Sequence, residues 1–238
     1  LHGRSGFYHG EVAQRLVDGV RAAGGIWSMD DMAQYRVVER EPVTGTYKGM
    51  RVVSASLPSS GGVVLQTMLN ILAGFPLDTL DEATRTHVII EAMRRAYRDR
   101  AEYLGDPDFQ DIPVARLTSV AHADRLRESI QLHRATGFSA ETDTGAAGEG
   151  MNTTHFSILD SEGNRVAATL SVNYPFGACF MPPGTGVLLN NEMDDFSARP
   201  GVPNLYGLVG SGANAIAPGK RPLSSMSPTF VESEDGVA

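Results

Sequence analysis

The stretch TTHFSILDSEGNRVAATLSV (Thr153–Val172) carries the clearest strand pattern of the chain. Thr154, Phe156 and Ile158 fall on alternate positions, which is the side-chain period of a β-strand with two different faces. The residues DSEGN that follow favour a tight turn, and the run RVAATLSV after them is a second strand candidate. The stretch therefore predicts a β-hairpin that begins at Thr153.

The sequence upstream of this hairpin changes first to a linker and then to helices. Residues 136–152 are small, polar and rich in glycine, which predicts a linker or a mobile loop. Farther upstream, apolar residues recur every three or four positions, as on one face of a helix. The predicted helices are Glu11–Ala23, a short helix opened by a Ser28 and Asp31 capping box, Val63–Phe75, Asp81–Leu104 and Ser119–His133, and Tyr47–Ser56 is predicted as a strand. These elements predict an α+β chain, mainly helical before the linker and rich in strands after it.

The helix predicted at Asp81–Leu104 has an apolar face and a series of arginines. We expect the buried face to be the one formed by Ile90, Met93, Tyr97, Ala101 and Leu104. The arginines that fall mostly off that face are Arg94, Arg95, Arg98 and Arg100. We interpret them as a solvated or ion-paired helix face and not as a nucleic-acid site, because the chain as a whole is acidic.

Composition excludes several classes of protein. Of the 238 residues, 42% are hydrophobic, and 20 basic against 28 acidic residues give a net charge of −8. This composition is that of a globular chain, and its negative net charge disfavours binding to nucleic acid. The sequence has no apolar run long enough to cross a membrane. Cys179 is the single cysteine, so no intrachain disulfide can form, and we expect a buried strand thiol. His87, His122 and His133 lack the spacing of metal ligands, and we predict no metal and no cofactor.

The first threonine of the hairpin has two interpretations. If the chain were cut before Thr153, this residue would carry a hydroxyl nucleophile and, in its own α-amino group, a base with a pKa of about 8. Taken alone, however, a Thr-Thr pair is also ordinary strand composition. The spacing by itself leaves both interpretations open.

Several longer motifs resemble a single family along the whole chain. The hairpin is followed by FGACFMPPGTGVLLNNEMDDFSARPGVPN (Phe176–Asn204) and KRPLSSMSPT (Lys220–Thr229), and this series is similar to the small subunit of a γ-glutamyltransferase. PSSGG (Pro58–Gly62) and YRDRAEYLGDPDF (Tyr97–Phe109) resemble the end of that family's large subunit. The resemblance implies the four-layer αββα sandwich of the N-terminal-nucleophile hydrolases, of which this chain would form a part.

Members of that family are made as precursors that cut themselves before a threonine, and this threonine matches Thr153. The resemblance therefore implies a cleavage site between Asn152 and Thr153. Residues 1–152 would be the C-terminal part of the large subunit and residues 153–238 the N-terminal part of the small subunit, together forming a heterodimer. The family's carboxylate-binding arginine and oxyanion-hole Gly-Gly match no residue here, so we expect this piece to belong to a longer chain and to be inactive alone.

The implied activity is hydrolysis and transfer of γ-glutamyl groups. Thr153 would attack the γ-carbonyl of glutathione or a related γ-glutamyl compound, and the ester would pass to water or to an acceptor amino acid or peptide. Ser171 matches a position that is usually threonine in the family and that hydrogen-bonds the terminus of the nucleophile. Asn173, Glu192 and Asp195 match the groups that hold the substrate's α-amino group, a role suited to amide and carboxylate oxygens.

The remaining matches concern the substrate's carboxylate and a lid. Ser224 and Ser225 match the pair that binds the α-carboxylate, and Tyr206 matches the lid residue that closes over the substrate. Asp194 and Asp195 favour an α-amino substrate over the glutaryl side chain of the related cephalosporin acylases. Such an acylase, or a non-catalytic homologue that is never processed, remains the alternative. Bacterial members of the family are commonly exported, which implies a periplasmic or extracellular location.

Overall fold

The computed structural model describes residues 2–137, 153–202, 204, 209–234 and 236–237, and these form two compact units. Of the described residues, the first unit contains 2–40, 153 and 171–192, and the second contains the rest. Each unit therefore draws on residues from both sides of the predicted cleavage site. The predicted boundary at residue 152 concerns where the chain is cut, and it stays a prediction.

The first unit is built on three helices, α1 (Gly3–Tyr8), α2 (Glu11–Ala22) and α3 (Met29–Gln34). The apolar face predicted for α2 is buried, and the predicted Ser28 and Asp31 capping box begins α3. Val187 and Leu189, from the segment after the hairpin, pack against this helical core. Cys179 lies in the same segment, and the prediction of a buried strand thiol is wrong: its side chain is exposed, in a turn with a φ of 52°.

The second unit contains a four-stranded antiparallel sheet in the order β1 (Val43–Tyr47), β2 (Met50–Ser54), β5 (Thr229–Ser233) and β6 (Gly236–Val237). The single strand predicted at Tyr47–Ser56 is instead the middle and end of a β1–β2 hairpin. Lys48 and Gly49 form its two-residue turn with φ values of 48° and 81°, the backbone that such a turn requires. Strand β2 lies between β1 and β5, so residues far apart in the sequence share one sheet.

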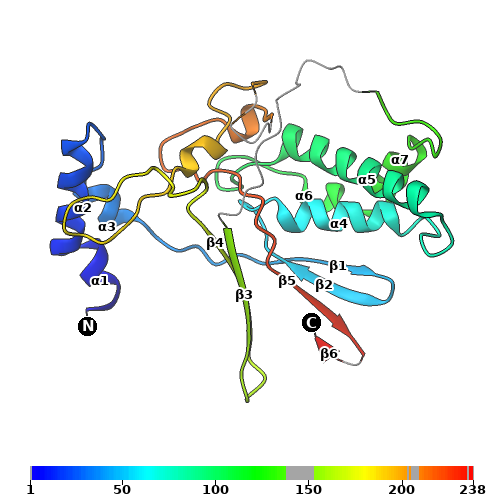
Figure 1. Cartoon of the computed structure of the whole chain (residues 1–238), viewed down its shortest axis with the longest axis horizontal. Helices are drawn as coiled ribbons and strands as arrows, with labels where there is room; N and C mark the ends of the chain where they lie inside the picture. Colours follow the sequence, from blue (N-terminus) through cyan, green and yellow to red (C-terminus); the bar gives the residue numbers. More distant parts are fainter. Residues whose placement is uncertain (1, 138–152, 203, 205–208, 235, 238) are drawn as a thin grey trace. The chain divides into compact units, whose positions relative to one another are not determined.

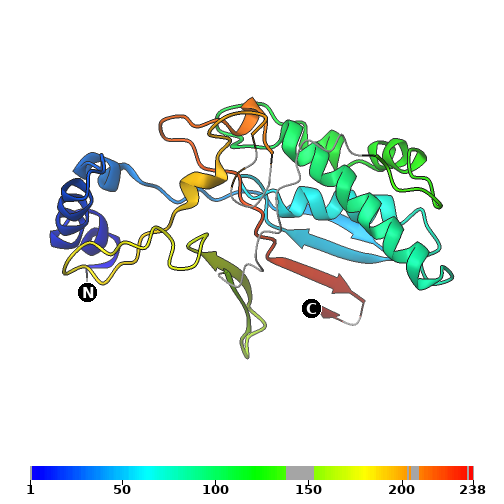
Figure 2. The ribbon, with the colours of Figure 1, turned by 45° about the horizontal axis from the view of Figure 1, so that its top comes forward.

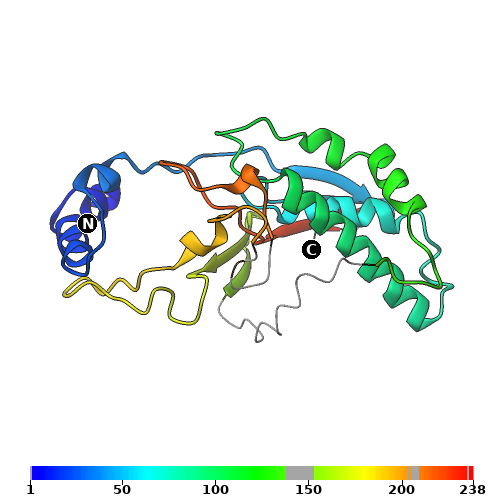
Figure 3. The ribbon, with the colours of Figure 1, turned by 90° about the horizontal axis from the view of Figure 1, so that it is seen from above.

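Helices cover one face of this sheet, as Figures 1 and 2 show. The helices are α4 (Gly61–Leu72), α5 (Glu82–Tyr103), α6 (Val114–Leu117) and α7 (Val120–Glu128). Helix α4 contacts β1, β2, α5 and α7, and seen from above it lies between α5 and α7 (Figure 3). Two apolar clusters form the core between these elements, and Leu223, from the end of the chain, belongs to the cluster of Leu57 and Val63.

The buried face predicted for α5 is wrong for Ile90, Met93 and Tyr97, which are between 38% and 48% exposed. At the end of the helix, Leu104 is buried as predicted and Ala101 is partly buried. The buried side of the helix carries small and apolar residues together with four charged ones, listed here: Val88, Glu91, Ala92, Arg95, Ala96, Asp99 and Arg100. Hydrophobic periodicity did not predict this buried face, because the burial of these charges depends on partners elsewhere in the fold.

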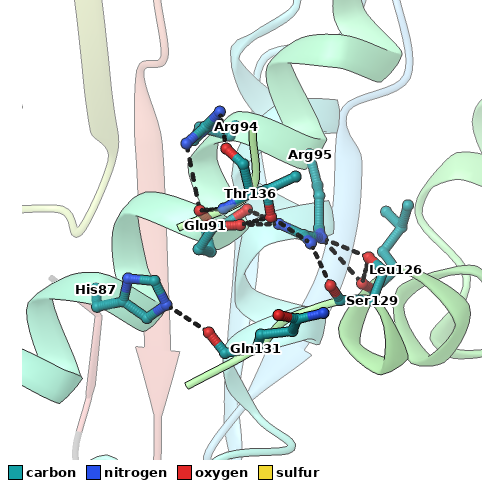
Figure 4. Close-up of polar contacts among 8 residues, drawn as sticks. All are labelled: His87, Glu91, Arg94, Arg95, Leu126, Ser129, Gln131 and Thr136. Atoms are coloured by element: carbon teal, nitrogen blue, oxygen red, sulfur yellow. Dashed lines mark hydrogen bonds and ion pairs between the residues drawn. The ribbon is translucent and has the colours of Figure 1, made fainter. Parts of the chain in front are cut away.

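A cluster of polar contacts joins α5 to the chain that follows α7 (Figure 4). Arg95 Nη1 lies 2.5 Å from Glu91 Oε2, and Arg95 also donates to the carbonyl oxygens of Leu126 and Ser129. Glu91 in turn accepts hydrogen bonds from the backbone N–H and the hydroxyl of Thr136. The predicted ion pairing of the arginines is thus confirmed for Arg95, but inside the protein and not on a solvated face. Helix α7 ends earlier than predicted, and the chain after it is held by this cluster.

The predicted hairpin is confirmed. Strands β3 (Thr153–Leu159) and β4 (Arg165–Ser171) pair in a two-stranded sheet of their own. Two short 3₁₀ helices, η1 (Glu192–Asp195) and η2 (Gly212–Asn214), follow in the chain. Within the described part of the chain, no helix is both long and apolar enough to cross a bilayer.

Candidate active site

The hairpin brings the predicted nucleophile next to its predicted partner. Thr153 is the first residue of β3 and Ser171 the last residue of β4, so the two residues lie at the same end of the two-stranded sheet. Thr153 Oγ1 lies 3.1 Å from Ser171 Oγ. The backbone N–H of Asn173 donates to Ser171 Oγ at 2.9 Å, which leaves the Ser171 hydroxyl proton free to point to Thr153. Ser171 therefore contacts both Thr153 and Asn173.

Asn173 is held in place by a second asparagine that the sequence analysis did not identify. The φ of Asn173 is 71°, which turns the chain away from β4, in a backbone region that asparagine adopts more readily than most residues. Asn173 Nδ2 donates to the carbonyl oxygen of Asn191 at 3.2 Å. Asn191 Oδ1 accepts the backbone N–H of Tyr174 at 2.9 Å, and Asn191 N donates to the carbonyl oxygen of Val172. Asn191 thus joins the end of β4 to the segment that carries Glu192.

Glu192 is the residue after Asn191 and is partly buried. Its backbone N–H donates to Asn190 Oδ1 at 3.0 Å, which fixes the start of η1. Burial raises the pKa of the Glu192 carboxyl above its ordinary value, because a charged carboxylate loses hydration there. An ammonium group placed beside it would restore the charged form.

In the second unit, Asn214 connects the segment of Asp195 to the segment of the two serines. Asn214 is 5% exposed, and its Nδ2 donates to the carbonyl oxygen of Asp195 at 2.6 Å. Its Oδ1 accepts the backbone N–H of Leu223 at 3.1 Å. The next residue in the chain is Ser224. One buried amide therefore fixes two backbone segments, each of which carries a predicted substrate-binding residue.

The turn Leu223–Met226, here called the serine turn, is attached to the motif PSSGG. Ser224 N donates to the carbonyl oxygen of Pro58 at 2.9 Å, and both the N–H and the hydroxyl of Ser60 donate to the carbonyl oxygen of Ser224 at 2.8 Å. Gly61 allows this approach, because a Cβ there would lie 2.5 Å from the carbonyl oxygen of Met226. Ser224 is partly buried and Ser225 exposed, so the hydroxyl of Ser225 is open to a ligand.

Two predicted site residues, Asn152 and Tyr206, lie outside the described residues. Among the residues that are described, no group of histidine, cysteine, aspartate and glutamate is placed to hold a metal ion. His122 Nε2 lies 2.6 Å from Asp99 Oδ2 in the interior, and His155 Nδ1 contacts Thr169 Oγ1 at 2.8 Å within the hairpin. Both histidines therefore have structural partners.

The chemistry available at the hairpin end is nucleophilic attack by a hydroxyl. A threonine hydroxyl with a neighbouring hydroxyl at hydrogen-bond distance can exchange a proton during such an attack. Amide oxygens, carboxylates and serine hydroxyls, as found at the other predicted positions, are groups that bind the two charged ends of an amino acid.

Comparisons with known proteins show which family the chain is similar to. A family model described as Gamma-glutamyltranspeptidase matches residues 1–238. The glutathione hydrolase proenzyme of Pseudomonas sp. (strain A14) is 52% identical over 237 residues, which cover 98% of this chain and 41% of that protein. Cephalosporin acylase from Bacillus halodurans has a TM-score of 0.76 at 28% identity, over 98% of this chain and 39% of that structure. Helicobacter pylori gamma-glutamyltranspeptidase has a TM-score of 0.55 at 40% identity, over 56% of this chain and 39% of that structure.

The chain spans about two fifths of the length of the relatives it matches. The family model, in contrast, covers this chain from end to end. The fold shared with the solved structures is the mixed α+β arrangement described above. The chain belongs to the gamma-glutamyltranspeptidase family.

Proposed function

We propose that the protein to which this chain belongs is a self-processing γ-glutamyl hydrolase and transferase. The observation that carries the proposal is the contact of Thr153 Oγ1 with Ser171 Oγ at 3.1 Å, at the first residue of the hairpin. Family membership and 52% identity to a glutathione hydrolase proenzyme support it. Glutathione and other γ-glutamyl compounds are the proposed donors, with water, amino acids or peptides as acceptors.

Self-processing would prepare the nucleophile. The Thr153 hydroxyl oxygen attacks the Asn152 carbonyl carbon, the peptide C–N bond breaks, and an ester forms while the nitrogen takes the proton. Water then hydrolyses this ester, which leaves a carboxylate on Asn152 and a free α-amino group on Thr153. That amino group, with an ordinary pKa of about 8, can accept the hydroxyl proton in the next reaction.

Catalysis would repeat the same acyl transfer on the substrate. Thr153 Oγ attacks the γ-carbonyl carbon, the γ-amide C–N bond breaks, and the proton moves from the threonine to the leaving amine. Water or an acceptor amine then attacks the ester carbonyl carbon and takes the γ-glutamyl group. The ester C–O bond breaks, and the Thr153 hydroxyl is restored. Ser171 is proposed to hold the amino end of Thr153 through its hydroxyl.

Binding of the glutamyl group would use the other predicted residues. Asn173, Glu192 and Asp195 are proposed to accept hydrogen bonds from the α-ammonium, and Ser224 and Ser225 to donate to the α-carboxylate. Tyr206 is proposed as the lid residue. The whole protein is proposed to form the four-layer αββα sandwich, as a large- and small-subunit heterodimer exported to the periplasm or outside the cell.

The nucleophile is tested in the full-length protein with two neighbouring threonines. We expect Thr153→Ala to abolish both the cut before residue 153, measured by intact mass, and the release of an anilide from γ-glutamyl-anilide. Thr154→Ala, on the adjacent position, is the matched control and should still be cut and active. A Thr153→Ala protein that is cut and active would show that the proposed mechanism is wrong.

An acylase acting on a glutaryl amide is the second candidate. The similarity to cephalosporin acylase from Bacillus halodurans over 98% of this chain favours it. A glutaryl group lacks the α-ammonium, so it has no use for the carboxylates of Glu192 and Asp195. The ratio of kcat/KM on γ-glutamyl-anilide to that on glutaryl-anilide decides: a ratio above one supports the transferase and a ratio below one the acylase. Absence of the cut and of both activities would indicate a non-catalytic homologue.

A further inference from the structure

Arg100 is a buried cation whose position the proposed mechanism does not use. It lies near the end of α5 and is 6% exposed. Burial lowers the pKa of its guanidinium, and the negative charge of Asp195 acts in the opposite direction. A buried arginine still keeps its charge, so its hydrogen bonds must offset the hydration it has lost.

These hydrogen bonds lead to the serine turn. Arg100 Nε donates to Ser60 Oγ at 2.9 Å, and Arg100 Nη2 donates to the carbonyl oxygen of Leu223 at 3.4 Å. The Ser60 hydroxyl in turn donates a hydrogen bond to the carbonyl oxygen of Ser224 at 2.8 Å. The guanidinium therefore fixes two successive carbonyl groups, one directly and one through a single buried hydroxyl.

Arg100 also faces the segment of Asp195. Arg100, Asp195, Asn214 and Leu223 line the same cavity of the second unit. Asn214 bridges the backbone of Asp195 to that of Leu223, so the amide and the guanidinium lie together between the two segments. Asp195 and the serine turn are the proposed partners of an ammonium and a carboxylate that a single carbon atom joins. Their spacing must therefore match a fixed distance in the substrate.

We propose that Arg100 is a positioning residue, which sets the spacing between Asp195 and the serine turn and thereby the affinity for γ-glutamyl substrates. This inference rests on the proposed function. Arg100 does not contact the substrate; it acts through Ser60, the backbone of the serine turn and the charge of Asp195. A purely structural arginine would instead affect folding, self-cleavage and turnover together.

The test uses the full-length protein with Arg100→Gln, Arg100→Lys and the control Arg98→Gln, an exposed arginine of the same helix. For Arg100→Gln we expect KM for γ-glutamyl-anilide to rise about tenfold or more, the effect of losing hydrogen bonds made by a charged group. We expect kcat to change less, the cut before Thr153 to remain, and Arg98→Gln to match the wild type. Arg100→Lys keeps the charge facing Asp195 but loses the forked donors of the guanidinium. Its KM should therefore lie between that of the wild type and that of Arg100→Gln.

Ser60→Ala provides a second variant if Arg100→Gln does not fold. It removes the hydroxyl between Arg100 and Ser224 while leaving the N–H of residue 60, and its KM should also rise with the cut intact. A folded Arg100→Gln protein with unchanged KM overturns the inference. The inference is also overturned if every variant at Arg100 and Ser60 loses stability, self-cleavage and kcat in parallel. Wild-type protein that cleaves neither γ-glutamyl-anilide nor glutaryl-anilide overturns the proposed function itself, and this inference with it.

Discussion

The Glu192 carboxylate is partly buried and has therefore lost hydration that an exposed glutamate keeps. Its pKa is raised by burial, so protonation on acidification occurs at a higher pH than for a glutamate in water. A substrate ammonium binds the carboxylate and not the protonated acid. We therefore expect KM for a γ-glutamyl substrate to rise as the pH falls through the pKa of Glu192, measured as KM against pH in the full-length enzyme.

The comparison for this prediction is Glu192→Gln, which keeps an oxygen acceptor without a titrating charge. Its KM should be higher than the wild-type value at neutral pH and should change less on acidification. Glu162→Gln, an exposed position in the turn of the hairpin, should follow the wild-type curve. Superimposable curves for the wild type and Glu192→Gln would show that Glu192 does not face the ammonium.

Residue-scale prediction from sequence worked best where partners are close along the chain. The hairpin pattern is enough to place Thr153 opposite Ser171, because antiparallel pairing of the two strands follows from the turn between them. Asn191 and Arg100 could not be found in this way. The asparagine acts through backbone atoms on the far side of a long loop, and the arginine through carbonyl groups more than a hundred residues away.

At the scale of elements, α5 shows why hydrophobic periodicity can select the wrong face. The helix bounds are confirmed to within one residue, because Asp81 caps the helix as a local signal predicts. The buried face carries Glu91, Arg95 and Arg100, which periodicity assigns to solvent. Each is satisfied by groups from the loop after α7, from Ser60 or from the serine turn, and such pairings have no local signature.

We expect the polar cluster on α5 to contribute to stability in a way that depends on pH. Burial alone raises the pKa of Glu91, but hydrogen bonds from Thr136 and Arg95 outweigh it and lower that pKa to about 2. Because the folded-state pKa is depressed, this contribution is present above the unfolded-state pKa, about 4.3 for a glutamate. It is lost as the pH falls from there to about 2. Figure 4 shows the contacts of Glu91 with Thr136 and Arg95.

We expect Glu91→Gln to lower the free energy of unfolding at pH 7 by about 3 kcal/mol or more, because Arg95 would remain buried without a carboxylate to balance its charge. The measurement is urea unfolding of full-length protein kept uncut by Thr153→Ala. Glu82→Gln, exposed in the first turn of α5, should cost less than about 1 kcal/mol. The difference between wild type and Glu91→Gln should shrink at pH 3; an equal difference at both pH values would contradict the assignment.

At the scale of the whole molecule, a cut before Thr153 would not separate the two pieces. Strand β2 lies before the cut and β5 after it, and they pair from Arg51 opposite Glu232 to Ser54 opposite Thr229. Leu223 lies in the same apolar cluster as Leu57. In the first unit, Val187 and Leu189 pack against helices from before the cut. Both compact units are therefore shared between the proposed subunits.

We accordingly expect the two cut pieces to co-elute in size-exclusion chromatography without denaturant and to separate only in urea that unfolds them. Leu223→Asp, which places a carboxylate at a position 2% exposed, should release free subunits at lower urea, because a buried charge without a partner costs several kcal/mol. Val202→Asp, 45% exposed and also after the cut, is the matched control and should behave as the wild type. Separation of the wild-type pieces in plain buffer would mean that the shared sheet and cores do not hold the subunits together. The positioning proposed for Arg100, which lies before the cut and holds Leu223 after it, would then lose its basis.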